Sequence, residues 1–598
     1  MSKKKPAINY TSRDFESIKS DLVNYARRYY PDTFKDFSIN SFGSLMLDTV
    51  SYVGDILSFY LDYQVNESFL STATEYDNVL KISKQLGLKA DLAAASFGTL
   101  AFFIEIPASS NGSPDYDYAP FLKAGSQFST RDGKLFTLLE DVNFKDIEQN
   151  EVVPGQINNQ TSVPTTYAIR ARGQAISGEL AVHEEVLGSY QRFRKVEIPG
   201  NNITEIVSVI DSEGNNYFEV DYLTQNTIYV PIANQNQNMS KVPNILKPIS
   251  IPRRYVVLKE RERVFLQFGF GTNENVSSVL DPSTVMLQQH GKNYVTDDSF
   301  DPASLTKTDS LGISPSDTIL TIIYRVNSAE NTNTAAATIV NVKNAIIDFQ
   351  SEFDLDVSLV QGVRGSLEVI NEEAFIGSSP LPNADEIRER AFGVYGMQNR
   401  IVTKDDLITA TYNMPRQFGS ISKAMAYQDS DSFNQRNINL YVMSKGSNGK
   451  FQKSNEVIKN NLKTYLSRFK MINDSIDILD ANIINLRISY KIICFPDVNK
   501  FTALENSKTD LINYFSNRRD FEIGEPFLIT DVFAVLKNSP LVLDVIEVDA
   551  VTKTGPSYSD SNFNVEDSKS TDGRKILCPI DSIFEIKFPN TDIVGELE

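Results

Sequence analysis

The sequence predicts an α+β protein of several domains, with a helical bundle segment first, a β-rich middle and two α/β sandwich modules last. Apolar residues recur at helical spacing up to about residue 95, and short alternating runs then continue to about residue 330. Helical and strand patterns alternate after about residue 375. A chain of 598 residues is too long for one core. We therefore expect domains at 1–95, 96–330, 331–480 and 481–598.

Three helices are predicted in the first domain. Thr11 and Asp14 form a possible capping box before the first, and Pro31 ends it. The third helix, around 76–86, stops at Gly87 in the manner of a glycine C-cap.

The helix between them, FGSLMLDTVSYVGDILSFYLDYQ (42–64), carries an unusually wide apolar face. At about 100° per residue, its apolar residues cover an arc of roughly 200°. Serines and aspartates at spacings of seven fill the remainder and are predicted to face solvent: Ser44, Ser51, Ser58, Asp48, Asp55 and Asp62. One neighbouring helix cannot cover so wide an arc, so we expect a bundle within the chain or shared with other subunits. The predicted bundle surface consists of Phe42, Leu45, Met46, Val53, Ile56, Phe59 and Tyr60.

The middle domain is predicted to be mostly β-structure, because Asn, Gly, Ser and Pro clusters separate short alternating runs. The clearest predicted strands are LAFFIEI (100–106), NITEIVSVID (202–211), TIYVPIA (227–233), RYVVLKERERVFLQFGFG (254–271) and DTILTIIYRV (317–326). The polar stretch NSAENTNTAAATIV (327–340) is predicted to be a linker or an exposed loop.

The C-terminal part predicts two small α/β modules in series, in the order β-β-α-β and then β-α-α-β. A helix at 384–395 is followed by one that opens with Thr403 as cap and Asp406 at the third helical position. The predicted elements after these are strands at 421–427 and 438–444, a helix at 455–469, a strand at 483–494, helices at 501–516 and 531–538, the latter capped by Thr530, and a strand at 541–548.

The composition disfavours two classes of partner. With 58 basic against 77 acidic residues the formal charge is −19, which repels nucleic acid. The apolar run GTLAFFIEIPA (98–108) is interrupted by Glu105 and Pro107 and is too short to span a bilayer. No secretory signal is visible, and two cysteines, Cys494 and Cys578, fit folding in a reducing cytoplasm. We expect no nucleic-acid partner and no membrane partner.

Motifs for catalysis or cofactor binding are weak. HEEVL (183–187) has Leu187 where a zinc protease needs its second histidine, and Cys494 is predicted to pack as a small hydrophobe. The loops QDSDSFNQ (428–435) and DSEGNNYFE (211–219) only partly match calcium loops, so calcium stays open. We expect no cofactor, no metal and no enzyme, although closely paired carboxylates of a hydrolase could lie anywhere in the chain.

The stretch GSSPLPNADEIRERAFGVYGMQNRIVTKDDLITATYNMPRQFGSISKAMAYQ (377–428) resembles the baseplate J-like family of contractile phage tails. The residues that stand in the family pattern are Glu386, Ile387, Arg388, Arg390, Ala391, Arg400, Val402, Thr403, Asp405 and Asp406. Residues 10–70 are similar to the helical start of the baseplate wedge subunits of T-even-type contractile-tailed phages. Two departures are GSSP (377–380), where relatives often have a double glycine and an acid, and Phe270 in place of an acid in FGFG (268–271).

The resemblance implies a non-enzymatic virion subunit in the tail baseplate, assembled in the host cytoplasm. It implies as partners a second copy in each wedge, a larger wedge subunit, neighbouring wedges, the sheath-initiating wedge subunit and the central hub. It also suggests a conformational anchor for the ring-forming region, made of Arg388, Arg390, Arg400, Thr403 and Asp406. The alternatives are a subunit of a tail-derived injection or secretion particle, a tail-associated polysaccharide or cell-wall hydrolase, and a receptor-binding adhesin.

Overall fold

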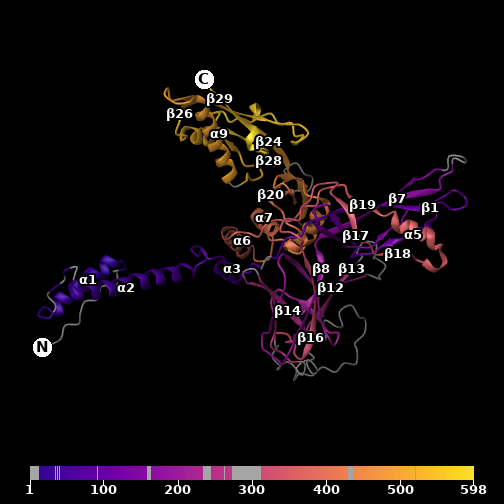
Figure 1. Cartoon of the computed structure of the whole chain (residues 1–598), viewed down its shortest axis with the longest axis horizontal. Coiled ribbons are helices and arrows are strands. Elements are labelled where there is room, and N and C mark those ends of the chain that lie inside the picture. Colours follow the sequence, from indigo (N-terminus) through magenta and orange to yellow (C-terminus); the bar gives the residue numbers. More distant parts are fainter. Residues whose placement is uncertain are drawn as a thin grey trace. The chain divides into compact units, whose positions relative to one another are not determined.

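The computed structural model confirms the α+β class and divides the chain into two compact units. The first unit contains residues 1–88 and 382–395, and the second contains residues 89–381 and 396–598. Figure 1 shows the elements of both. The residues that the structure describes are 13–33, 36, 38, 41–89, 92–157, 163–233, 244–260, 263–272, 311–428, 436–518 and 520–597.

The first unit contains the three predicted helices. They are α1 (Phe15–Tyr29), α2 (Phe42–Asn66) and α3 (Tyr76–Gln85). Asp14 caps α1 by accepting from the Ser17 N–H, and Thr11, the other half of the predicted capping box, lies outside the described residues. Ser41 caps α2 in the same way. After α3, Gly87 adopts a φ of 101°, which favours glycine, so its predicted role as a C-cap is confirmed.

The beginning of α6 (Ala384–Met397) also belongs to the first unit, although it is distant in sequence. Ile387 and Ala391 lie in one buried apolar cluster with Leu70, Val79 and Leu80. This packing joins α6 to α3 and to the turn before it.

The second unit begins with a β-sheet whose strands come from two separate parts of the sequence. Its strands are ordered β17-β3-β4-β7-β1-β19, with β6 paired to β7. They span Phe97–Pro107 (β1), Gln127–Thr130 (β3), Leu135–Leu138 (β4), Glu151–Pro154 (β6), Thr166–Ser177 (β7), Ile339–Asn344 (β17) and Glu368–Asn371 (β19). The same segments of the chain also form a small sheet of β2 (Phe121–Leu122), β5 (Val142–Asn143) and β18 (Ile347–Asp348). Helix α5 (Val357–Gly365) follows β18 in the chain. The first five strands of the larger sheet precede residue 178 and its last two follow residue 338, so the chain leaves this sheet after β7 and returns to it at β17.

The segment between β7 and β17 forms the second large sheet, ordered β8-β16-β10-β11-β14-β15-β9. Its strands span Glu179–Leu187 (β8), Lys195–Ile198 (β9), Ile203–Asp211 (β10), Asn216–Glu219 (β11), Arg254–Glu260 (β14), Arg263–Phe268 (β15) and Thr318–Val326 (β16). A separate hairpin joins β12 (Thr227–Ala233) to β13 (Asn244–Ser250). The predicted strands at 202–211, 227–233 and 317–326 are thereby confirmed, as is the one at 100–106 in β1, whereas the run at 254–271 contains two paired strands, β14 and β15.

Two α/β modules complete the unit. The first contains α7 (Lys404–Tyr412), β20 (Lys423–Gln428), β21 (Asn437–Lys445), β22 (Phe451–Gln452), α8 (Glu456–Leu466) and β23 (Ser475–Asp480). The second contains β24 (Asn482–Cys494), α9 (Lys500–Asn517), β25 (Phe527–Leu528), α10 (Ile529–Lys537), β26 (Val542–Thr552), β27 (Lys575–Ile576), β28 (Ser582–Glu585), α11 (Pro589–Asp592) and β29 (Ile593–Leu597).

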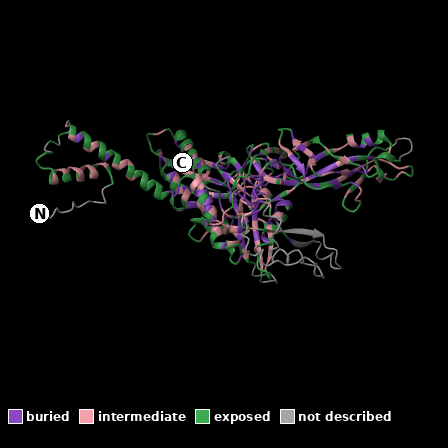
Figure 2. Cartoon of the chain, turned by 90° about the horizontal axis from the view of Figure 1, so that it is seen from below, coloured by how far each residue is buried: buried purple, intermediate pink, exposed green. Residues whose placement is uncertain are grey.

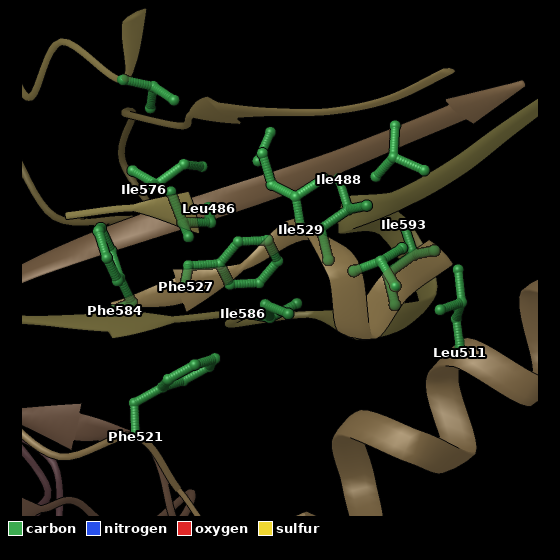
Figure 3. Packing of buried hydrophobic residues seen from close by; sticks show 14 of the residues in the cluster. Leu486, Ile488, Leu511, Phe521, Phe527, Ile529, Ile576, Phe584, Ile586 and Ile593 are labelled. Carbon is green, nitrogen blue, oxygen red and sulfur yellow. The ribbon is translucent and has the colours of Figure 1, made fainter. Parts of the chain in front are cut away.

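In the second module, α9 and α10 pack against the sheet and form a buried core with it. Leu486 and Ile488 of β24 pack with Leu511 of α9 and with Phe527 and Ile529 (Figure 3). The prediction that Thr530 caps α10 is wrong. The helix begins at Ile529, two residues before its predicted start, and Leu528 is its N-cap without a side-chain hydrogen bond, because the chain enters the helix directly from β25.

The prediction that 327–340 is a linker or exposed loop is only partly right, because Ser328, Glu330, Asn331 and 335–337 are exposed but the remaining residues include buried ones. Asn327, Thr332 and Asn333 are buried and their side chains are hydrogen-bonded: the two asparagine amides donate to backbone carbonyls, and the Thr332 hydroxyl donates to another side chain. Asn327 Nδ2 donates to the Ala94 carbonyl (2.9 Å), and Thr332 Oγ1 donates to Ser177 Oγ (3.1 Å). The buried polar residues of this segment therefore form a hydrogen-bonded junction rather than a solvated connection.

Candidate interaction surface

The apolar arc of α2 is open to solvent in the isolated chain. Phe42 is 74% exposed, Phe59 66% and Tyr60 62%, and Leu45, Met46 and Val53 are exposed as well. Ile56 is half-buried. Figure 2 shows α2 mostly in the colour of exposed residues. Six of the seven residues of the predicted bundle surface are therefore exposed in the isolated chain.

Helix α1 packs against the opposite side of α2, so the prediction that the Ser and Asp stripe faces solvent is wrong for Ser44 and Ser51, whereas the side chain of Asp62 is 54% exposed. Ser44 and Ser51 are buried. A Cβ added to Gly54 would lie 3.2 Å from Ile18 Cδ1, which shows how closely the two helices approach. Lys19 Nζ binds Asp48 Oδ1 (2.5 Å), and Arg13 Nη1 binds Asp62 Oδ1 (2.8 Å). Small side chains allow α1 to pack closely, and Asp48 and Asp62 pair with basic residues in and just before α1.

The exposed arc contains two rows at the spacing of three and four residues that coiled coils use. One row runs Phe42, Leu45, Thr49, Tyr52, Ile56, Phe59 and Tyr63, and the other runs Met46, Val50, Val53, Leu57 and Tyr60. At 100° per residue the centres of the rows lie roughly 100° apart, and both lie away from the α1 side. Each row has the width that one helix can cover. The geometry of α2 therefore suits two further helices in addition to α1.

Glu67 fixes the joint between α2 and α3. It is the C-cap of α2, and α3 has Glu75 as N-cap with no side-chain hydrogen bond of its own. The Glu67 carboxylate instead accepts from the Thr74 N–H (2.7 Å), the Thr74 hydroxyl (2.6 Å) and Asn78 Nδ2 (2.9 Å). Hydrogen bonds from Thr74 and Asn78 lower the pKa of Glu67 to about 2. This role of Glu67 was not predicted, because its partners Thr74 and Asn78 lie in the next helix and the turn before it, beyond the reach of a local pattern.

This joint predicts a pH dependence. The pKa of Glu67 is depressed in the folded state relative to about 4.3 in an unfolded chain, so its contribution is fully present above pH ~4.3 and is lost as pH falls toward about 2. We expect protection of the Thr74 and Glu75 amides from hydrogen exchange to fall across this window. In Glu67→Gln the protection should already be reduced at pH 7 and vary less with pH. Glu16→Gln, an exposed residue of α1, is the control. Equal protection in wild type and Glu67→Gln at pH 7 would contradict this role.

Arg388 joins α6 to the turn between α2 and α3. Its Nε donates to the Leu70 carbonyl (2.7 Å) and its Nη2 to the Ala73 carbonyl (2.7 Å), while Nη1 pairs with Asp385 (2.5 Å). Arg390 lies on the same helix and pairs with Glu386 (2.5 Å). The geometry makes Arg388 the anchor of this packing, because its fork binds two carbonyls at once.

We predict that Arg388→Ala weakens the attachment of α6. Two carbonyl groups lose their donor, which costs about 1–3 kcal/mol. Hydrogen exchange of residues 384–395 should accelerate in this variant. Arg400→Ala is the matched control, since Arg400 is exposed, lies after α6, and interacts electrostatically with Asp406 of α7. If both variants exchange alike, Arg388 is not an anchor.

Of the other predicted anchor residues, Arg400 lies in the connection before α7, and Thr403 and Asp406 lie at the start of that helix. Thr403 Oγ1 accepts from the Asp406 N–H (3.1 Å), and the Asp406 carboxylate accepts from the Thr403 N–H (2.8 Å), so the predicted capping box is confirmed. Burial opposes but does not outweigh the hydrogen bonds from Thr403 and Val402, which lower the pKa of Asp406. The five residues are divided between the two units: Arg388 and Arg390 belong to the first, and Arg400, Thr403 and Asp406 belong to the second. Arg388 and Arg390 contact their own surroundings, and Thr403 and Asp406 cap another helix.

The residues considered above as candidates for catalysis or metal binding take part in ordinary packing, ion pairs and turns. His183 lies on strand β8 beside Glu185 (3.3 Å), and burial raises the pKa of the Cys578 thiol to about 12. Cys494 packs against the core of the last module, as predicted. Asp211 accepts from the Glu213 and Asn215 N–H groups and so closes the turn that was considered for calcium. The other calcium candidate, 428–435, lies almost wholly outside the described residues.

Within the described ranges, no group of three or more His, Cys, Asp or Glu residues is placed to hold a metal ion. Among the helices in those same ranges, none is both long and apolar enough to cross a membrane.

Three comparisons with known proteins bear on this surface. No curated protein matches the chain. One matching solved structure is described as "Cryo-EM structure of the anti-feeding prophage (AFP) baseplate, 6-fold symmetrised", at 9% identity, over 97% of this chain and 99% of that chain, with a TM-score of 0.28. That score is too low for the likeness to support a conclusion. The family model described as "Bacteriophage baseplate protein, N-terminal domain" matches residues 14–85, which contain α1, α2 and α3. The exposed helix α2 thus lies within a segment similar to the N-terminal domain of a bacteriophage baseplate protein.

Proposed function

We propose that this chain is a structural, non-enzymatic subunit of a bacteriophage tail baseplate, and that α2 joins it to other subunits in a helical bundle. The observation that carries the proposal is the exposed apolar arc of α2 within the segment that the baseplate family model matches. An isolated helix gains little from such a face in water, whereas burial of each large side chain against a partner contributes about 1.5–3 kcal/mol.

The two rows on α2 support a bundle in which two helices from other chains flank it. In the finer form of the proposal, the tail is contractile, the chain is a wedge subunit of the baseplate J-like group, and the flanking helices come from a second copy and a larger wedge subunit. The modules of the second unit then meet neighbouring wedges, the sheath-initiating wedge subunit and the central hub. A subunit of a tail-derived injection or secretion particle would use the same surfaces, and the neighbouring genes would distinguish the two.

Electron microscopy of purified tails tests the proposal. We expect an epitope tag on this chain to be labelled at one end of the tail, at the baseplate, and tails assembled without the chain to lack a complete baseplate. Labelling along the tail tube, or complete baseplates without the chain, would overturn the proposal.

A further inference from the structure

A second candidate binding surface lies in the last module, where residues of α9 and α10 line a solvent-exposed cleft. It is a shallow, open cleft of about 660 Å³. Its lining includes Asp510, Asn513, Tyr514 and Asn517 of α9, Val535 of α10 and the C-cap residue of α10, Asn538. None of these residues belongs to the α2 surface.

The orientation of α9 explains why these side chains are available. Leu511 is fully buried and points into the core of the module (Figure 3). Ala503 and Ser507, at helical spacing before it, are buried as well. Asn513 and Asn517 lie on the flank of the helix away from this buried side and are exposed. The core packing therefore holds the cleft residues on a fixed helix.

The groups left for a ligand are mainly amides. The side chains of Asn513, Asn517 and Asn538 make no hydrogen bond within the described part of the chain. The charged lining groups already have partners. Arg518 Nη2 binds Glu525 Oε1 (2.7 Å), and Asp510 Oδ2 accepts from Ser539 Oγ (2.7 Å). A site for a phosphate or another anion would need an arginine without such a carboxylate beside it.

The spacing of the amides suits an extended polypeptide. Asn513 and Asn517 are four residues apart on a helix, which places them about 6 Å apart along its axis. In an extended chain the backbone groups on one side recur every two residues, at roughly 6.6–6.8 Å. Each asparagine amide offers both a donor and an acceptor, as each peptide group does. Two successive same-side peptide groups can therefore meet the two asparagines in register.

We propose that the cleft between α9 and α10 binds an extended peptide segment of a partner protein through Asn513, Asn517 and Asn538, with apolar side chains of the peptide against Val535 and Pro540. The site is independent of the α2 surface, so either one can fail in experiment while the other stands.

Selection from a display library of random twelve-residue peptides on the purified full chain tests the proposal. We expect peptides to be enriched, and their synthetic forms to bind the double variant Asn513→Ala/Asn517→Ala about tenfold more weakly or worse, because two hydrogen bonds are lost. Alanine at exposed helix positions favours the helix, so the variant should fold. Asn506→Ala, an exposed asparagine of α9 outside the cleft, is the matched control and should bind as the wild type does.

Two outcomes would overturn the proposal. One is that no peptide is enriched on the wild type over the double variant, or that the selected peptides bind both proteins equally. The other is that a panel of neutral glycans, which could use the same amides, gives binding that the double variant loses while no peptide is selected.

Discussion

Val53→Asp should abolish co-purification of the full chain with the subunits that cover α2, while the chain itself stays folded. Val53 belongs to one of the two apolar rows and is 48% exposed in the isolated chain, so an aspartate there remains solvated and changes stability by about 0.5 kcal/mol or less. In a bundle the same carboxylate is buried without a partner and the apolar contact is lost. Together these effects cost ~4 kcal/mol or more, which is about a thousandfold in affinity.

The measurement is pull-down of the tagged full chain from cells that express the remaining tail proteins, with far-UV circular dichroism as the folding check. Ile472→Asp is the matched control, because Ile472 is 99% exposed and lies on a turn after α8. We expect this control to retain all partners. A Val53→Asp variant that recovers the same partners as the wild type would contradict the bundle assignment.

Asn333→Ala should lower the free energy of unfolding of the second unit by about 3 kcal/mol. Asn333 is 2% exposed. Its Nδ2 donates to the carbonyls of Ser378 (2.9 Å) and Lys445 (3.1 Å), and its Oδ1 accepts from the Ser378 N–H (2.9 Å). Removal of the side chain leaves three buried backbone groups without these partners, and each such group costs about 1–3 kcal/mol in a non-additive way.

Urea unfolding followed by tyrosine fluorescence measures this effect, since the chain contains 26 tyrosines and no tryptophan. Asn344→Ala, on the exposed part of β17, should change the free energy of unfolding by about 0.5 kcal/mol or less. Asn333→Asp keeps the acceptor but loses the donor, so it should also destabilise the unit. A transition in Asn333→Ala that coincides with that of the wild type would show that the junction does not stabilise the fold.

The local elements could be predicted from the sequence because their patterns are local. The capping box of Thr403 and Asp406 and the alternation in 483–494 need no knowledge of the rest of the chain. The pairing of β1 with β19, which are about 270 residues apart in sequence, has no local signal. The return of the chain to its first sheet therefore became visible only in the structure.

Two predictions of solvent exposure, for the Ser and Asp side of α2 and for 327–340, fail at their buried residues for the same physical reason. On α2 the pattern gives two faces but does not say which one the chain itself covers, and here α1 covers the small and polar face. In 327–340 a polar composition suggested solvent, yet buried strand ends require hydrogen-bonding side chains. Polar residues indicate hydrogen bonding in both places, and only the tertiary structure shows whether the partner is water or protein.

The central claim is that other protein chains cover the apolar arc of α2. Alkylation of a cysteine at Tyr60→Cys tests it most directly, with peptide mass analysis to separate this thiol from Cys494 and Cys578. We predict rapid modification in the purified chain, where Tyr60 is 62% exposed, and strong protection in assembled tails. Equal rates of modification in the chain and in assembled tails would contradict the claim.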